Sequence, residues 1–275
     1  MDRRAAGLTK EKTRRGLPCW IGTQPVAGGS APASIAGTIV LGAAETIAAF
    51  VAQRSLGYTG PQSASICSGM LDMKTANTSF CTPETMLIDC GYVELFRRRY
   101  GLKLGVAGWA DYTSAKFPGI QAAYEKTLEA LTVSHFTGIP PRGGSELLDC
   151  GKTFSPEQLL LNADMGSGLW QLATKPVVDD GTMGLQTILD VGSGLGKSAL
   201  DSDFTIAHFR QFWYPKWFDR GVWRGDEHLD EGGLLSKLTE EYKAIKSVYK
   251  KPAVDRDRLH KARQVVERAK KHLLA

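Results

Sequence analysis

The chain has 275 residues, and 43% of them are hydrophobic, which is enough to bury a substantial core in one large domain or two small ones. Its net charge of +5 is concentrated at the ends, with +4 on residues 1–15 and +7 on residues 237–275, so the middle carries −6. This distribution argues against a basic nucleic-acid-binding core and favours solvated faces at both ends. The five cysteines have no metal-ligand spacing, so we expect reduced thiols, no metal site and a cytoplasmic protein.

One apolar segment could be mistaken for a membrane span. Residues 31–52 are long enough to cross a bilayer and contain a single charged residue, Glu45. However, the segment is rich in Ala and Gly, carries Ser34, Thr38 and Thr46, and has few large aliphatic side chains. Such small residues suit a helix packed closely against a sheet, so we expect a soluble protein.

Strand-like and helix-like segments alternate along the first two thirds of the chain. The predicted strands cover residues 18–26, 62–68, 103–107 and, with a weaker pattern, 135–139. The predicted helices cover residues 32–53, 82–99, 120–133 and 155–172. Four strand–loop–helix units in succession indicate a parallel sheet with helical crossovers.

Helix-start signals support these boundaries. Pro32 is expected in the first turn of its helix, where proline is favoured. Thr82 and Ser155 are predicted N-caps, each followed by a proline and a glutamate. Beyond Lys175 the pattern is helical and irregular, and the tail is an amphipathic helical pattern that is interrupted at Pro252.

Polar and aromatic side chains gather after the predicted strands, where ligands bind in parallel sheets. The third strand is followed by a cluster that contains Trp109, Asp111 and Tyr112. Asp72 follows the second strand, and Glu146 lies in the loop after the fourth. For the three acidic residues, a functional role and a purely structural role both remain open.

A glycine-rich segment imitates two nucleotide-binding loops. Residues 188–196 are similar to the first loop of S-adenosylmethionine-dependent methyltransferases, but fewer than eighty residues follow, too few for the remaining strands of that domain. Residues 196–198 imitate a phosphate-binding loop, but Val191 stands where that loop requires its first glycine. We therefore expect a structural turn. For His208, packing within a helix is the simpler interpretation, and for the aromatic run 212–218 it is core packing or a partner surface.

Several segments, in this order and at similar spacing, resemble the trimethylamine methyltransferase family of corrinoid-dependent methyltransferases. They are the Gly-Gly-Ser-Ala-Pro run at 28–32 with its Ala-rich helix, the Met-Leu-Asp-Met-Lys-Thr run at 70–75, and segments 115–126, 155–159 and 208–216. The resemblance covers about residues 16–220. Together these matches are specific, although no single one is decisive.

The resemblance implies an (α/β)8 barrel that moves a methyl group from a methylated amine to cob(I)alamin. The cob(I)alamin would be carried by a separate corrinoid protein, and no cofactor would be held permanently. Aromatic rings suit the binding of a methylated cation, each contact contributing about 1–2 kcal/mol when desolvated. On this basis the expected catalytic residues are Tyr112, Asp111 and Glu146, and the expected substrate-binding residues are Trp20, Asp72, Trp109 and His135.

Two departures from the family pattern refine this expectation. Tyr112 falls at or next to the position at which trimethylamine methyltransferases carry pyrrolysine. The resemblance is therefore to the non-pyrrolysine branch, whose substrates are quaternary amines such as glycine betaine, with a tertiary amine as the other candidate. After Leu159 the family pattern has a paired acid, where this chain has Asn162-Ala163-Asp164, which leaves the role of that helix open.

The resemblance covers only about the C-terminal half of family members. We therefore predict a partial (α/β)8 TIM-type barrel of about four strand–helix units over residues 17–233. A basic segment, 1–16, precedes it and a basic helical tail, 234–275, follows it. An exposed strand edge would associate with a complementing N-terminal half or with a second copy. A catalytically silent remnant or an amine-binding module is the alternative, and an S-adenosylmethionine-dependent enzyme is the less favoured one.

Overall fold

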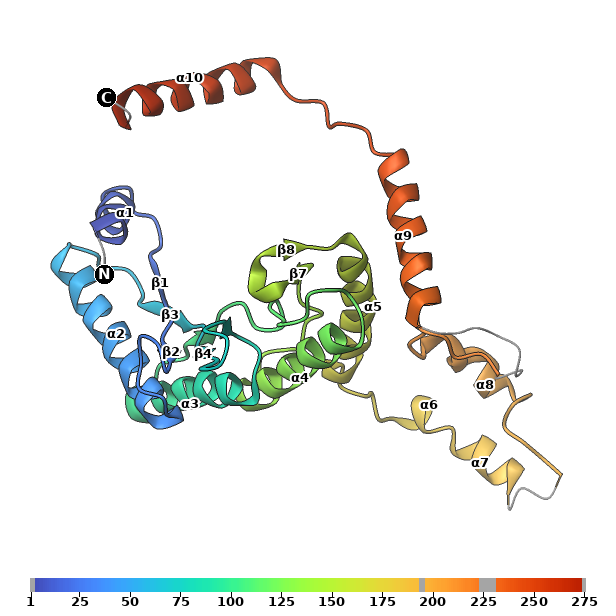
Figure 1. Ribbon diagram of the computed structural model, residues 1–275. Coiled ribbons are helices and arrows are strands. Elements are labelled where there is room, and N and C mark those ends of the chain that lie inside the picture. Colours follow the sequence, from blue (N-terminus) through green and yellow to red (C-terminus); the bar gives the residue numbers. More distant parts are fainter. Residues whose placement is uncertain (1–2, 193–195, 223–230, 274–275) are drawn as a thin grey trace. The chain divides into compact units, whose positions relative to one another are not determined.

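The computed structural model describes residues 3–192, 196–222 and 231–273 (Figure 1). The protein is a mixed α/β structure that consists mostly of helices with small sheets. It divides into two compact units, residues 1–239 and residues 240–275. The domain boundaries expected at residues 16 and 233 stay a prediction.

A three-stranded parallel sheet forms the centre of the first unit. Its strands are β1 (Trp20–Thr23), β3 (Ser63–Ile66) and β6 (Gly105–Val106), in the order β1-β3-β6. Helix α2 (Ile35–Ser55) joins the first two strands, and α3 (Pro83–Tyr100) joins the second and third. The strands of this sheet are therefore neighbours in the order of the chain, and because they are parallel their carboxyl ends lie at one edge of the sheet.

Two smaller sheets, which the sequence analysis does not predict, extend the loops of the first unit. In the first, β2 (Val26–Ala27) pairs in parallel with β4 (Gly69–Leu71), which pairs antiparallel with β5 (Thr78–Ser79). In the second, β7 (Leu147–Leu148) and β8 (Thr153–Phe154) form an antiparallel pair around the short 3-10 helix η1 (Asp149–Gly151).

The predicted helix starts are confirmed at two of three places. Thr82 caps α3 with a capping box that it forms with Thr85. Ser155 caps α5 (Pro156–Ala173), where its hydroxyl accepts the Gln158 N–H. Helix α2 instead begins three residues after Pro32, because the Ser34 hydroxyl caps it by accepting the Gly37 N–H at 3.1 Å.

The predicted fourth strand is wrong. Its first three residues form the last turn of α4 (Ile120–Thr137), which ends at Gly138 in a left-handed conformation with a φ of 74°. A short apolar run does not by itself distinguish a strand from the end of a buried helix. In the described part of the chain the parallel sheet therefore has three strands, and these do not close a barrel.

The hydrophobic core lies between the parallel sheet and the helices that follow its strands. Tyr92, Phe96 and Ile88 of α3 are fully buried beside Ile66 of β3 and Val133 of α4. The Tyr92 hydroxyl is paired with the Thr46 hydroxyl of α2 at 2.7 Å, so this buried polar contact joins two helices of the core.

Helix α2 is long and apolar enough to cross a membrane by length and composition alone. Its inner face nevertheless carries the buried polar side chains of Thr38, Thr46 and Gln53. Thr38 donates its hydroxyl hydrogen bonds to backbone carbonyls, and Thr46 bonds to α3. These contacts fit a helix that packs on a sheet within a protein core.

The remaining helices are largely exposed. Helix α1 (Arg3–Arg14) precedes β1, and α6 (Asp180–Met183), α7 (Leu185–Val191), α8 (Asp203–His208) and the 3-10 helix η2 (Phe209–Gln211) follow α5. Residues 188–191 are helical, so the strand that an S-adenosylmethionine loop requires is replaced by α7. The next part of that motif, 193–195, lies outside the described residues.

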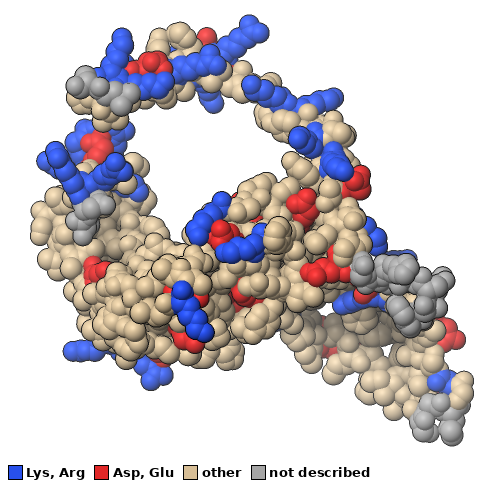
Figure 2. Space-filling view, in the orientation of Figure 1, with Lys and Arg blue, Asp and Glu red and all other residues tan. Residues whose placement is uncertain are grey.

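The tail forms two helices, α9 (Glu231–Ser247) and α10 (Arg256–Leu273), and the predicted interruption at Pro252 lies between them. Helix α10 is exposed along its whole described length, and Figure 2 shows Lys and Arg over its surface. His208, on α8, bonds to the Phe204 carbonyl at 2.7 Å and stacks on that ring, so it packs as expected.

Candidate functional site

The segment after β6 carries three of the predicted site residues. The Ala107 N–H donates to the Ile66 carbonyl at 2.7 Å, which continues the pairing of β6 with β3 by one residue. The chain then turns through Gly108, where φ is 68°, into Trp109 and Ala110. The segment thus begins at the carboxyl end of the central strands, which is the place expected for a ligand site.

Ala110 lies at the centre of this segment in an unusual conformation. Its φ of 61° is in the left-handed region, which a residue with a Cβ rarely adopts, and the residue is fully buried. Its N–H donates to Glu129 Oε2 at 2.8 Å, and its carbonyl accepts from Lys126 Nζ at 3.3 Å. Both peptide groups that flank the Ala110 Cα are therefore held by side chains of α4.

Lys126 holds a wider stretch of backbone than one residue. Its ammonium also donates to the carbonyls of Asp111 and Ser145, the second at 3.0 Å. Burial lowers the pKa of Lys126 to about 8, although nearby carboxylates, Asp111 first among them, oppose the shift. The ammonium therefore joins the segment after β6 to the loop that follows α4.

A second buried carboxylate repeats this arrangement at the neighbouring strand. Asp89 of α3 accepts the Ser68 N–H at 2.9 Å, two residues beyond the end of β3. Burial raises the pKa of Asp89 to about 7 and that of Glu129 to about 8, and the charge of Asp89 raises the pKa of Glu129 further. Two successive strands thus end in loops that a buried acid of the next helix holds in place.

Trp109 and Asp111 are brought together by Arg142. The Arg142 guanidinium donates to the Trp109 carbonyl at 2.8 Å and to Asp111 Oδ2 at 2.8 Å. It also lies over the Trp109 ring, 5.2 Å from the ring centroid. Trp109 is buried, whereas Asp111 and its ion pair are partly exposed. The face of the indole that Arg142 covers is therefore already occupied by a cation of the protein.

Tyr112 is half-buried between small residues and another ring. Its ring centroid lies 5.2 Å from that of Phe80, and its edges face Gly108 and Gly151 so closely that a Cβ at either glycine would stand less than 3 Å from the ring. Burial raises the pKa of the Tyr112 phenol, and the charges of Cys67, Asp111 and Glu129 act in the same direction. The phenol is consequently neutral at physiological pH.

Glu146 lies beside this group and the other three predicted residues lie apart from it. The charge of Glu146 raises the pKa of Lys126, and its carbonyl accepts the Ser155 N–H at 3.1 Å. Trp20 begins β1, at the opposite end of the strand, with 56% of its surface exposed. His135 is exposed in the last turn of α4 rather than after a strand.

Asp72 stabilises the turn in which it lies. It is exposed in the loop between β4 and β5, where its carboxylate accepts the Lys74 N–H at 2.8 Å and its backbone bonds to Ala76 and Asn77. The hydrogen bond from the Lys74 backbone, followed by that from the Thr75 side chain, lowers the pKa of Asp72. The structure therefore brings together Trp109, Asp111 and Tyr112, places Glu146 within electrostatic reach of Lys126, and leaves Trp20, Asp72 and His135 outside the cluster.

Sequence reasoning missed the buried ionisable residues beneath the cluster. Lys126 and Glu129 are three positions apart on α4, in line with the buried Ala122 and Val133. Asp89 lies in the same way on the buried stripe of α3. A charged residue on an otherwise apolar helical stripe was the available signal, because such a side chain is buried only where it finds partners.

The turn after Tyr112 is fastened by another carboxylate of α4. Glu125 accepts the Thr113 hydroxyl at 2.5 Å, the Ser114 N–H at 2.7 Å and the Cys81 thiol at 3.2 Å. Burial alone would raise the pKa of Glu125, but these hydrogen bonds and that of Gln121 outweigh it and the pKa is lowered. Among the described residues, three or more His, Cys, Asp or Glu side chains nowhere form a group that could hold a metal ion.

Asp164 of α5 lies where the family pattern has a paired acid, and it binds the backbone of another loop. Its carboxylate accepts the backbone N–H groups of Lys216 and Trp217 at 2.8 and 2.9 Å, with that of Phe218 at 3.4 Å. The neighbouring Asn162 is buried and donates to the Ser145 carbonyl. This helix thus anchors two loops, and Trp217 packs beside its apolar face. Packing is therefore confirmed for Trp217, whereas Phe212, Tyr214 and Phe218 of the aromatic run are exposed.

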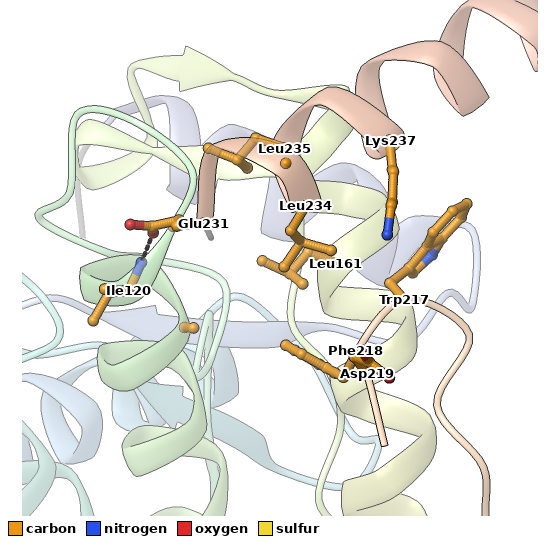
Figure 3. A pocket seen from close by; sticks show the side chains of 12 residues that line it. Ile120, Leu161, Trp217, Phe218, Asp219, Glu231, Leu234, Leu235 and Lys237 are labelled. Carbon is orange, nitrogen blue, oxygen red and sulfur yellow. Dashed lines mark hydrogen bonds between the residues drawn. The ribbon is translucent and has the colours of Figure 1, made fainter. Parts of the chain in front are cut away.

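A separate apolar pocket of about 300 Å³ lies at the start of α4 (Figure 3). Glu231 of α9 closes one side, where its carboxylate accepts the Ile120 N–H at 2.6 Å and so caps α4. Leu161 and Leu234 form its floor, and Trp217 and Lys237 stand on the other side in the close-up view. Neither Tyr112 nor Trp109 lines this pocket, so it is distinct from the cluster described above.

The fold and the cluster define an α/β protein built of βαβ units, with aromatic and carboxylate side chains at the carboxyl ends of parallel strands. The sequence profile of the trimethylamine methyltransferase (MTTB) family matches residues 1–273, so the chain belongs to that family. It is 28% identical over 263 residues to trimethylamine methyltransferase MttB2 of Methanosarcina mazei, covering 93% of this chain and 50% of that protein.

The chain is also similar to two further relatives. The chain is 31% identical over 184 residues to trimethylamine methyltransferase MttB of Methanosarcina thermophila, covering 66% of this chain and 37% of that protein. It is 25% identical over 223 residues to glycine betaine methyltransferase of Desulfitobacterium hafniense, covering 81% of this chain and 46% of that protein. The chain therefore spans about half the length of the curated relatives that it matches.

Proposed function

We propose that the protein is a methyltransferase that takes a methyl group from a quaternary methylated amine such as glycine betaine, with a tertiary amine as the second choice. Membership of the trimethylamine methyltransferase family supports the reaction class. The single observation that carries the substrate class is the half-buried, neutral ring of Tyr112 beside Phe80, within the electrostatic reach of Asp111. A methylated cation is attracted both by aromatic faces and by nearby negative charge.

The methyl acceptor in this proposal is cob(I)alamin on a partner corrinoid protein, as a substrate rather than a resident cofactor. The Co(I) electron pair forms the new Co–CH3 bond, the C–N bond breaks, and its electron pair leaves on the neutral tertiary amine. Because the quaternary nitrogen is already a leaving group, the site needs to orient the cation and exclude other nucleophiles. Tyr112 would hold the methylated nitrogen, Trp109 would contribute only the ring face that Arg142 does not cover, and Asp111 and Glu146 would supply charge. Trp20, Asp72 and His135 would contact substrate only in an assembly that extends the site.

We further propose that the described sheet is part of an (α/β)8 barrel. The order β1-β3-β6, in which successive parallel strands are neighbours, supports this, and so does a chain that spans half the length of its relatives. A polypeptide that corresponds to the other half, or a second copy of this chain, would supply the remaining strands. We expect the assembly to work in the cytoplasm, without nucleic acid or membrane as a partner.

The test is methyl transfer to free cob(I)alamin. The purified chain, with and without a polypeptide that covers the other half of a relative, is mixed with cob(I)alamin and either glycine betaine or trimethylamine. Formation of methylcobalamin with glycine betaine is expected, and transfer from trimethylamine should be slower. Absence of methylcobalamin with every quaternary amine, even with the complementing polypeptide, would contradict the proposal.

A further inference from the structure

The backbone of Ala110 is a strained link between the two aromatic side chains of the cluster. It connects Trp109 directly to Asp111 and Tyr112, and its left-handed φ of 61° sets the direction in which the chain leaves the indole. For a residue with a Cβ this conformation is unfavourable, and it persists only where surrounding contacts hold it. The contacts that hold it therefore determine where both rings lie.

Those contacts come from one face of α4. Glu129 accepts the Ala110 N–H at 2.8 Å, and Lys126, three residues earlier, donates to the Ala110 carbonyl at 3.3 Å. Both side chains are almost completely buried, at 3% and 1% exposure. Neither donates to or accepts from the Trp109 or Tyr112 side chains. They act on the backbone between the rings.

The other side of Ala110 is closed by the loop after α4. A Cβ built on Gly144 would stand 1.8 Å from the Ala110 carbonyl oxygen, and the Ser145 carbonyl shares the Lys126 ammonium. The segment therefore cannot relax toward this loop without disturbing it. The peptide groups around Ala110 are fixed by two side chains on one side and by packed backbone on the other.

We propose that Glu129, assisted by Lys126, is the positioning residue that sets the geometry of the cation-binding side chains Trp109 and Tyr112 by fixing Ala110 in its left-handed conformation. This inference rests on the proposed function, because it assigns these rings to a methylated cation. It makes no use of the Glu129 charge. A neutral hydrogen-bond acceptor of the same shape should serve equally well.

The experiment measures both the exchange rate of the Ala110 amide and the affinity for a quaternary ammonium probe. Amide hydrogen exchange of the full chain is followed by 1H–15N NMR, and tetramethylammonium, the smallest quaternary ammonium, is the titrated probe. In Glu129→Ala, the Ala110 amide loses its acceptor, so its exchange should accelerate by about tenfold or more. The tetramethylammonium Kd should rise by a similar factor. In Glu129→Gln, which keeps an acceptor, both values should stay within about twofold of the wild type.

Three further variants separate positioning from general loss of structure. Asp89→Ala should accelerate exchange of the Ser68 amide and leave that of Ala110 protected, since it removes the equivalent acceptor at the neighbouring strand. Added to Glu129→Ala, the substitution Ala110→Gly should restore much of the lost affinity for tetramethylammonium, because glycine adopts a φ of 61° without strain. Glu94→Ala, on the exposed face of α3, should change neither exchange rate nor the Kd.

The outcomes are distinguishable. If Glu129→Gln weakens tetramethylammonium binding as much as Glu129→Ala, the charge acts on the cation directly and the positioning role is overturned. The same holds if Glu129→Ala frees the Ala110 amide without changing the Kd. If the wild type does not bind tetramethylammonium although its Ala110 amide is protected, the proposed function fails while the anchoring of the loop stands. Should Glu129→Ala not fold, Lys126→Met replaces it, with the same expected rise in the Kd and the same contrary result.

Discussion

Gly144 lies so close to Ala110 that a Cβ built on the glycine would stand 1.8 Å from the Ala110 carbonyl oxygen. The same loop presses on α5, because a Cβ on Gly143 would stand 2.1 Å from the Asn162 carbonyl oxygen. The loop after α4 thus runs between the segment that carries Trp109 and the helix that follows. Its glycines are required by the close approach of three stretches of backbone.

Replacing Gly144 should therefore be costly. We expect Gly144→Ala to lower the free energy of unfolding by about 2–4 kcal/mol, because the new Cβ meets rigid backbone at a φ of 74°. Gly138→Ala is the matched control, since Gly138 has the same φ and nothing within 4 Å of its Cβ position, and should cost about 1 kcal/mol. Urea unfolding measures both. Equal losses would mean that the loop moves aside and that the close approach has no energetic weight.

The ring of Tyr112, rather than its hydroxyl, should bind the cation. Tyr112→Phe keeps the aromatic face and should leave the tetramethylammonium Kd within about twofold of the wild type, whereas Tyr112→Ala should raise it about five- to thirtyfold. Isothermal titration calorimetry measures the Kd. Tyr100→Ala, which removes an exposed ring at the end of α3, is the control and should have no effect. An equal loss in Tyr112→Phe and Tyr112→Ala would assign the binding to the phenol oxygen instead.

Stability should decline as pH rises from about 4 to about 8. Burial raises the pKa of Asp89 to about 7 and that of Glu129 to about 8, so the folded state holds protons that the unfolded chain has released. Their contribution is complete below the unfolded values and is lost as pH passes the folded values, with a slope of up to about 1.4 kcal/mol per pH unit for each acid. Lys126, whose pKa burial lowers to about 8, acts in the opposite sense above that pH.

This pH dependence can be measured from urea midpoints between pH 5 and pH 8. Asp89→Asn removes one of the two titrating acids, so its decline should be shallower than that of the wild type below about pH 7. Lysine at 126 is unchanged in this variant and keeps its effect above pH 8. A decline in Asp89→Asn that is parallel to the wild type would show that Asp89 does not titrate in this range.

Asp164 should fix the aromatic segment that follows η2. Asp164→Ala leaves the N–H groups of Lys216 and Trp217 without their carboxylate, and we expect a loss of about 2–3 kcal/mol in the free energy of unfolding and a red shift of tryptophan fluorescence. Asp164→Asn keeps one acceptor oxygen and should lose about half as much. Ser167→Ala removes the exposed bond from Trp213 and the bond of the Ser167 hydroxyl to the Asp164 carbonyl, leaves the Asp164 carboxylate in place, and should cost about 1 kcal/mol. No change in fluorescence in Asp164→Ala would contradict this role.

Local sequence signals predicted the helix starts correctly where the stabilising interaction joins residues that are close in the sequence. Thr82 and Ser155 cap their helices as expected, because the capping hydroxyl and the N–H that it satisfies lie three residues apart. The strand predicted at the end of α4 is wrong because the local signal there is ambiguous. Residues 135–137, His-Phe-Thr, suit either a strand or a last helical turn, and the distinction depends on where Gly138 turns the chain.

By itself, the sequence determined the alternation of strands and helices, the family, and the cluster of Trp109, Asp111 and Tyr112 after the third strand. Only the tertiary structure decided that Trp20, Asp72 and His135 lie apart from that cluster, and that Lys126, Glu129 and Asp89 lie beneath it. The physical reason is that a buried charge is tolerated only where the fold supplies partners that are distant in sequence, such as the peptide groups of Ala110. A helical pattern shows which face is buried, but it does not reveal which backbone groups that face will meet.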